Sequence, residues 1–164
     1  MAIKHRGSVR HDRQEEGDIM KGSVVSVNIS SDKGQKKHGI GAGLLIVNHG
    51  LAHDAHAGME TRQVSLLARE SIEKIRAKGL DVKPGDFAEN LTTTGIILHE
   101  LPLGTRFRVG EAVILELTQI GKVCHDRCAI FRQVGDCVMP REGVFARVIS
   151  GGDVKAGDTI RVVQ

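Results

Sequence analysis

Short runs of β-branched and aliphatic residues, separated by glycine-rich turns, recur from Lys21 to the end of the chain. Runs of this kind are typical of strands, and their spacing is typical of an all-β barrel or sandwich. The chain has no Trp or Tyr and only four Phe, so Val, Ile and Leu must supply the core. The predicted strands are Ser23 to Asn28, Gly43 to Asn48, Leu91 to Leu98, Thr105 to Val109, Ala112 to Thr118, Gly143 to Ile149 and Asp158 to Val163.

Two of these runs predict a hairpin. Thr105 to Val109 alternates polar and apolar residues, as a strand with one solvent-facing side does, and its expected partner is Ala112 to Thr118 across a turn at Gly110. Two further segments, Val82 to Asp86 and Val154 to Asp158, share one pattern of residues. We interpret both as turns in which glycine supplies a positive φ.

One helix is expected after the first third of the chain. Apolar residues recur at three- and four-residue spacing from Val64 to Ile75, and Gly79 is placed to end the helix. A strand over Arg62 to Leu67 that leads into a helix from about Ala68 also fits the pattern. Periodicity alone does not separate these two interpretations.

The length of 164 residues is that of one domain. Residues 1–19 are polar and lack periodicity, so we expect a flexible tail there and a single domain over residues 20–164. The net charge is only +3, and no aromatic residues stand among the basic ones, which argues against a nucleic-acid partner. No apolar run has the length of a membrane helix or the form of a secretory signal. We therefore expect a cytoplasmic protein that makes no membrane contact.

The three cysteines, Cys124, Cys128 and Cys137, lie close together in the sequence. This grouping is unlike a disulfide framework, and it leaves a metal site, a reactive nucleophile or simple packing as interpretations. Cys128 and Cys137 stand among apolar residues, where cysteine commonly packs as a small hydrophobic residue. A resolving thiol or a metal ligand is the alternative for these two.

Cys124 stands in the basic segment from Gly121 to Cys128. The thiolate is the reactive form of cysteine, and neighbouring cations such as Lys122, His125 and Arg127 stabilise it. The segment therefore predicts a reactive thiol. A buried cysteine whose charged neighbours face water is the alternative, and a zinc site is a further one, although only one short ligand spacing is present.

Three histidines, His49, His53 and His56, form an H-x3-H-x2-H pattern. On a helix this spacing would suit a metal site, but Gly50 and Gly58 favour a loop. In a loop the imidazoles are either solvated or hydrogen-bonded, or else they are placed to contact an anion or a cofactor. In the second case His53 or His56 would also act as an acid or base.

Four stretches carry a resemblance to a known family, and they occur in order along the chain: His53 to Gly58 with Arg62 to Val64, Pro84 to Thr92, Leu103 to Thr105 with Val109 to Ala112, and Leu117 to Cys124 with Gly143 to Val148 behind it. In these stretches the chain resembles the MOSC domain, named for the C-terminal domain of molybdenum cofactor sulfurase, in its small stand-alone bacterial form. The resemblance extends from about Lys21 to Val163. It implies a mostly β fold, a closed barrel with a few short helices.

The resemblance also implies a site. Cys124 matches the motif cysteine of the family, which is thought either to carry sulfur as a persulfide or to ligate molybdenum. A basic pocket beside it would receive a phosphorylated pterin dithiolene or a similar anion. The candidates for its lining are His56, Arg62, Asn90, Lys122 and Arg141. Asn90 has an alternative role, which is to satisfy a loop backbone.

Two residues depart from the family pattern. Ala88 stands where glycine is common in relatives, and Cys128 adds a second thiol to the segment of Cys124. If the two thiols are close, a persulfide on one can resolve to a disulfide with the other.

Three functions are compatible with these features. The first is a sulfur carrier or transferase that takes sulfur from a cysteine desulfurase or another donor and delivers it to molybdenum cofactor, its acceptor enzyme or a metal–sulfur cluster. The second is a molybdenum-cofactor oxidoreductase that reduces N-hydroxylated compounds, and the third is a cofactor-binding module without chemistry of its own. Pyridoxal phosphate is not expected to be bound covalently by this domain alone. The sequence leaves the oligomeric state open, as well as the question of whether the chain is itself an enzyme.

Overall fold

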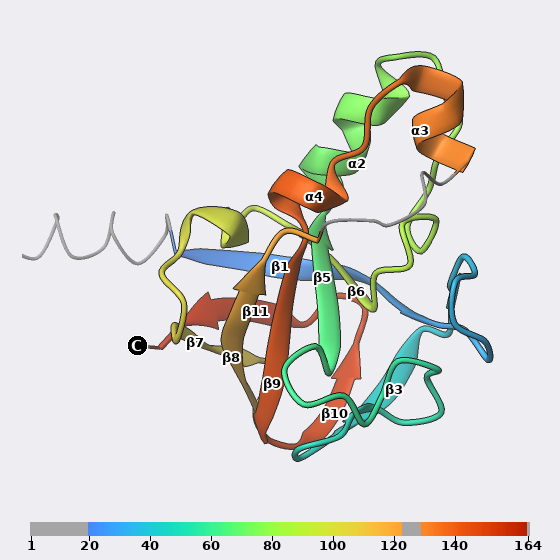
Figure 1. Cartoon of the computed structure of the whole chain (residues 1–164). Helices are drawn as coiled ribbons and strands as arrows, with labels where there is room; N and C mark the ends of the chain where they lie inside the picture. Colours follow the sequence, from blue (N-terminus) through green and yellow to red (C-terminus); the bar gives the residue numbers. More distant parts are fainter. Residues whose placement is uncertain (1–19, 123–128, 164) are drawn as a thin grey trace, which may run out of the picture.

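The computed structural model describes residues 20–122 and 129–163. Strands dominate the described part of the chain, and the helices in it are short (Figure 1). The strands are β1 (Lys21–Ile29), β2 (His38–Gly39), β3 (Ala42–Ile46), β4 (Gly50–Leu51), β5 (Val64–Ala68), β6 (Leu91–Thr94), β7 (Arg106–Val109), β8 (Val113–Ile120), β9 (Val144–Ser150), β10 (Gly152–Lys155) and β11 (Thr159–Val162). The helices are α2 (Arg69–Arg76), the 3-10 helix η1 (Leu98–Glu100), α3 (Ala129–Val134) and α4 (Met139–Glu142).

A closed barrel forms the centre of the described structure. Its strands follow the order β11, β7, β8, β9, β5, β6 and β1, and pairing of β1 with β11 closes the ring. The β5–β6 pair is parallel, and the other pairs of the ring are antiparallel. The expected class, a mostly β protein with a closed barrel and few short helices, is confirmed.

Alternation along the strands explains the barrel core. In β7, Phe107 and Val109 are buried while Arg106 and Arg108 lie on the outer side. Phe107 pairs with Leu115 of β8, so the two apolar side chains meet inside the barrel. The hairpin predicted for these two segments is confirmed, with Gly110 at a φ of 64° in its turn.

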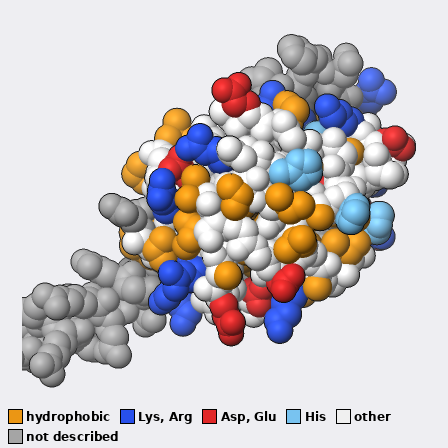
Figure 2. Space-filling view, turned by 90° about the horizontal axis from the view of Figure 1, so that it is seen from below, with side chains coloured by type: hydrophobic (Ala, Val, Ile, Leu, Met, Phe, Trp, Pro, Cys, Tyr) orange, Lys and Arg blue, Asp and Glu red, His pale blue; other side chains and the backbone are white. Residues whose placement is uncertain are grey.

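A small sheet of β10, β3 and β4 lies beside the barrel. Leu45 of β3 is buried against the barrel core, whereas Leu44 and Ile46 point outward and are exposed. Figure 2 shows hydrophobic side chains gathered on this face of the molecule, with histidine side chains beside them. The sequence did not predict β2, β4 or β10, because β2 and β4 have only two residues each and part of β10 was interpreted as a turn.

The helices α2, α3 and α4 form a layer above the barrel, as Figure 1 shows. A second apolar cluster lies between this layer and the barrel, and it includes Leu67, Ile72, Ile75, Val138 and Met139. A single helix from Val64 is wrong, and the alternative of a strand that leads into a helix is confirmed. The residues of β5 from Val64 to Leu67 are buried on both faces, so the strand shows no polar alternation by which to recognise it.

Two smaller expectations have different outcomes. The strand predicted from Leu91 to Leu98 is too long, because β6 ends at Thr94 and Gly95 follows with a φ of 83°. The two similar turns are confirmed, and each contains the same type of hydrogen bond. The Asp86 carboxylate accepts from the backbone N–H of Lys83 at 3.0 Å, and the Asp158 carboxylate accepts from that of Lys155 at 2.9 Å. Residues 154 and 155 also belong to β10.

Candidate functional site

The loop after β4 places Asp54 and His56 against the segment that follows β1. The backbone N–H of Ala55 donates to the Ser30 carbonyl at 2.9 Å, and this bond fastens the two segments together. Asp54 then reaches inward and is buried, while His53 stays exposed and adopts a φ of 70°. The Asp54 carboxylate accepts from the backbone N–H groups of Ser30 at 3.1 Å and of His56 at 3.2 Å.

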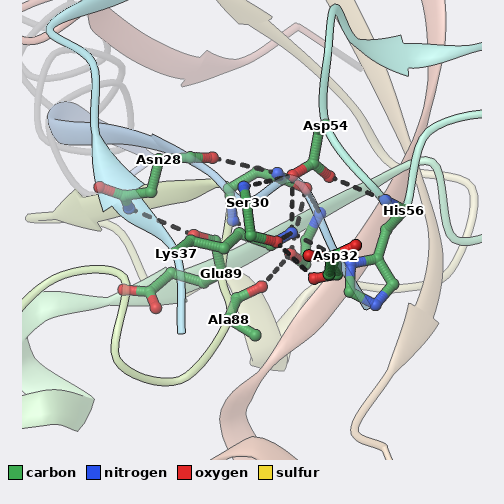
Figure 3. A network of polar contacts seen from close by, with 10 residues as sticks. Asn28, Ser30, Asp32, Lys37, Asp54, His56, Ala88 and Glu89 are labelled. Carbon is green, nitrogen blue, oxygen red and sulfur yellow. Dashed lines mark hydrogen bonds and ion pairs between the residues drawn. The ribbon is translucent and has the colours of Figure 1, made fainter. Parts of the chain in front are cut away.

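Lys37 and Asp54 form a buried ion pair at the centre of this network (Figure 3). Lys37 Nζ lies 2.7 Å from Asp54 Oδ1, and both side chains are fully inaccessible to solvent. The ammonium also donates to Ser30 Oγ at 3.2 Å and contacts His56 Nδ1 at 3.0 Å. All three N–H donors of Lys37 therefore have an acceptor, which is the condition for burying an ammonium without a large penalty.

These contacts change the pKa values of both titratable partners. Burial opposes ionisation of Asp54, but hydrogen bonds from Lys37, Asn90 and the Ser30 backbone outweigh it, so the pKa of Asp54 falls below its usual value. Burial is also the main reason why the pKa of His56 is lowered. The positive charges of Lys37, Lys122 and Lys33 lower it further, and the Asp54 carboxylate only partly opposes them.

The loop before β6 holds Lys37 from the other side. The backbone N–H of Lys37 donates to the Gly85 carbonyl at 2.8 Å. Gly85 has a φ of 93°, and a Cβ there would lie 2.2 Å from the Lys37 carbonyl oxygen, so this close approach needs glycine. The buried Glu89 carboxylate accepts from the Gly85 and Phe87 backbones, and burial raises the pKa of Glu89.

Ala88 lies in the same loop with a φ of 62°. A left-handed conformation is unfavourable for alanine and costs glycine little. The backbone of this position therefore favours glycine over the alanine that this chain carries.

Asn90 is buried, and its side chain ties three segments together. Its Oδ1 accepts from the backbone N–H of Ser65 at 3.0 Å and from the Ser65 hydroxyl at 3.2 Å. Its Nδ2 donates to the Asn28 carbonyl at 3.2 Å. The side chain also contributes to the low pKa of Asp54. These contacts correspond to the structural role that the sequence left open for Asn90.

Lys122 is brought into the neighbourhood of His56 by the end of β8. The backbone N–H of Gly121 donates to the Gly143 carbonyl at 2.7 Å, and Gly121 packs against the Pro140 backbone. Lys122 follows directly, and its charge acts on His56. Cys124, His125, Arg127 and Cys128 lie in residues 123–128, outside the described residues.

The two arginines predicted to line the pocket, Arg62 and Arg141, each contact another side chain. The Arg62 guanidinium lies over the Phe145 ring, 5.7 Å from its centroid. Arg141 of α4 is exposed, and its guanidinium donates to Asp136 at 3.1 Å. Hydrogen bonds from Arg141 and Lys78 hold the pKa of Asp136 at about 2. The candidates His56 and Lys122 thus share one electrostatic environment, whereas the side chain of Arg141 is engaged with Asp136.

Several residues of the network were not singled out by the sequence. Lys37, Lys33 and Ser30 lie in a polar segment between β1 and β2 whose lysines look like ordinary surface residues.

Cys137 packs in the apolar cluster beneath the helices, as expected for a small hydrophobic residue. Residues 20–122 and 129–163 contain no group of three or more His, Cys, Asp or Glu side chains arranged to hold a metal ion. The three histidines of the H-x3-H-x2-H pattern therefore form no such group.

A protein-family model matches this chain. The model of the MOSC domain matches residues 53–161, which include the Asp54–His56 loop, β6 and the segment of Cys124. The chain belongs to the MOSC domain family. This family is associated with functions related to molybdenum cofactor. The comparison with curated protein sequences gives no significant match.

Solved structures share the fold of this MOSC domain. YuaD from Bacillus subtilis superposes with a TM-score of 0.69 at 18% identity, over 87% of this chain and 96% of that one. YiiM from Geobacillus stearothermophilus gives 0.67 at 19% identity, over 87% and 75% of the two chains. YiiM from Escherichia coli gives a TM-score of 0.61 at 24% identity, over 88% of this chain and 70% of that one.

Among the described residues, no helix has both the length and the apolar character needed to cross a bilayer.

Proposed function

We propose that this MOSC domain is a cytoplasmic sulfur carrier or transferase in which Cys124 holds sulfur as a persulfide. The observation that supports the proposal most is the concentration of positive charge around His56. Lys122 and Lys33 both act on this imidazole, in addition to Lys37, whose charge is paired with Asp54, and Lys122 precedes Cys124 by two positions in the sequence. Positive charge of this kind lowers the pKa of a nearby thiol and favours the thiolate that attacks sulfur.

The proposed step is a transfer of sulfane sulfur between thiols. The Cys124 thiolate attacks the terminal sulfur of a donor persulfide, a new S–S bond forms, and the donor leaves as its thiolate. A nucleophilic acceptor then attacks the outer sulfur of the Cys124 persulfide, and Cys124 leaves as a thiolate. An acceptor that takes sulfide instead needs two electrons, which a second thiol supplies by forming a disulfide with Cys124. The donor is a cysteine desulfurase or another persulfide protein.

The acceptor we propose is molybdenum cofactor, its acceptor enzyme or a metal–sulfur cluster. The side chains near His56 suit an anionic, phosphorylated group, because Lys122 and Lys33 bring positive charge and the imidazole brings an N–H donor. Arg62 and Arg141 would add further cations if they leave Phe145 and Asp136. Bound molybdenum cofactor would supply the metal and the dithiolene sulfurs, and these residues would hold its charged end.

The test is loading of sulfur by a purified desulfurase and cysteine, followed by mass spectrometry of the intact chain and its peptides. We expect one extra sulfur atom on the peptide that contains Cys124, removed by a thiol reductant. Cys124→Ser should abolish the gain, whereas Cys137→Ser, at a buried thiol in the apolar cluster, should retain it. Sulfur on other cysteines only, or none on any, contradicts the proposal.

Metal analysis separates the carrier from a molybdenum-dependent reductase. In the reductase Cys124 is a ligand of molybdenum, and protein from a cofactor-producing host would contain the metal in stoichiometric amount. A carrier would be loaded with sulfur without retaining molybdenum. A cofactor-binding module without chemistry would still bind the cofactor after Cys124→Ser.

A further inference from the structure

We infer that the buried Lys37–Asp54 pair fixes the tautomer of His56, so that the imidazole presents its Nε2–H to the oxygen of an anionic ligand. The inference rests on the proposed function only for the biological identity of that anion. The state of the imidazole follows from contacts among described residues. Lys37 and Asp54 are thus positioning residues that act through His56.

The hydrogen bond between Lys37 and His56 has a defined direction. A lysine ammonium only donates hydrogen bonds, so His56 Nδ1, 3.0 Å from Lys37 Nζ, must be the acceptor. The proton of the neutral imidazole is then on Nε2. The ammonium cannot turn away without losing its ion pair, because Asp54 Oδ1 is 2.7 Å from the same nitrogen.

The surroundings of the His56 imidazole also determine its charge. A protonated His56 would direct an N–H at the Lys37 ammonium, which has no acceptor to offer. Burial and the cations Lys37, Lys122 and Lys33 all disfavour a further positive charge, and the Asp54 carboxylate opposes them only in part. His56 is therefore a neutral donor at neutral pH, and its Nδ1 is blocked as a general base and as a metal ligand.

Nε2 is the ring atom that remains available to a ligand. Figure 3 shows the second ring nitrogen directed away from the Lys37–Asp54 pair. Within the described part of the chain, this nitrogen has no hydrogen-bond partner, and the imidazole is half-buried. An N–H donor beside two lysines fits an anionic oxygen, such as that of a phosphate group. The imidazole adds direction to this site without adding charge.

The test is a two-bond proton–nitrogen NMR spectrum of the full chain with labelled histidine, assigned with His56→Gln. We expect the His56 pattern of an Nε2–H tautomer at neutral pH, and inorganic phosphate should shift this signal more than that of the exposed His53. The Cys124→Ser variant should behave identically, which makes the result independent of sulfur chemistry. An Nδ1–H tautomer, a mixture, or a phosphate effect no larger than at His53 overturns the inference.

Two variants separate positioning from folding. Lys37→Met with Asp54→Asn removes both charges together, and its retained fold is checked by circular dichroism. We expect a mixed His56 tautomer and phosphate binding weakened about tenfold, as for loss of one hydrogen bond to a charged group. Lys36→Met, at the exposed lysine next in sequence, should leave the tautomer unchanged. A double variant that keeps the pure Nε2–H tautomer and full phosphate affinity also overturns the inference.

Discussion

Replacing Lys37 by methionine is expected to leave a buried carboxylate without its counter-ion. Both members of the Lys37–Asp54 pair are fully buried at a separation of 2.7 Å. Ser30 Oγ keeps a hydrogen bond to the Asp32 carbonyl, so the penalty falls mainly on Asp54, which retains only hydrogen-bond donors. Removing one partner of a buried ion pair typically costs about 3–5 kcal/mol. This is a large part of the roughly 5–15 kcal/mol that stabilises a domain.

Urea unfolding followed by far-UV circular dichroism measures this loss, since the chain has no Trp or Tyr for fluorescence. With a mid-range slope of about 2 kcal/mol per molar urea, the midpoint of Lys37→Met should fall by about 1.5–2.5 M. Adding Asp54→Asn should recover about 1–3 kcal/mol, because a neutral amide replaces the unpaired charge. Lys36→Met serves as the control and should change stability by less than about 0.5 kcal/mol.

The pH dependence of this deficit identifies its cause. Without Lys37, the pKa of Asp54 should rise, because burial is then opposed by fewer favourable contacts. The deficit of Lys37→Met should therefore shrink as the pH falls and Asp54 becomes protonated. A Lys37→Met variant as stable as Lys36→Met, or a deficit that does not change with pH, refutes the reasoning.

Three other substitutions test further parts of the loop and the site. Gly85→Ala and Gly79→Ala both place alanine at a φ near +95°, but only the Cβ at Gly85 meets backbone, so Gly85→Ala should destabilise by about 1–3 kcal/mol more in urea unfolding. Ala88→Gly should raise the free energy of unfolding by up to about 1 kcal/mol. Glycine removes the strain of the positive φ, and this gain outweighs the extra conformational entropy of the unfolded chain. A loss of stability contradicts this prediction. Because the pKa of His56 is lowered, the unfolded chain binds more protons than the native protein below about pH 6.5. The contribution of His56 to stability should therefore decrease as the pH falls below about 6.5 and stay constant above it. His56→Asn should lack this pH-dependent loss of stability. Comparing the two proteins at equal pH cancels the opposite contribution from the raised pKa of Glu89. Parallel stability curves for the two proteins would exclude the predicted contribution of His56.

The sequence by itself determined the features that depend on neighbouring residues. Alternation in the segments of β7 and β8 predicted their hairpin, and the Gly85 and Gly157 turns were recognised from local pattern. The MOSC resemblance was carried by short motifs, and the family match over residues 53–161 confirms it. These signals need no knowledge of the tertiary structure, because each is set by steric preferences or spacing within a few residues.

Only the tertiary structure decided which polar residues are buried and what they contact. Lys37 resembles Lys36 in the sequence, yet one is fully buried against Asp54 and the other is exposed. The difference arises because three loops, after β1, after β4 and before β6, close over Lys37 and not over its neighbour. Likewise, Asn90 has its amide occupied by Ser65 and Asn28, which come from two other strands. Burial and long-range hydrogen bonds are properties of the closed barrel, so no local pattern could have revealed them.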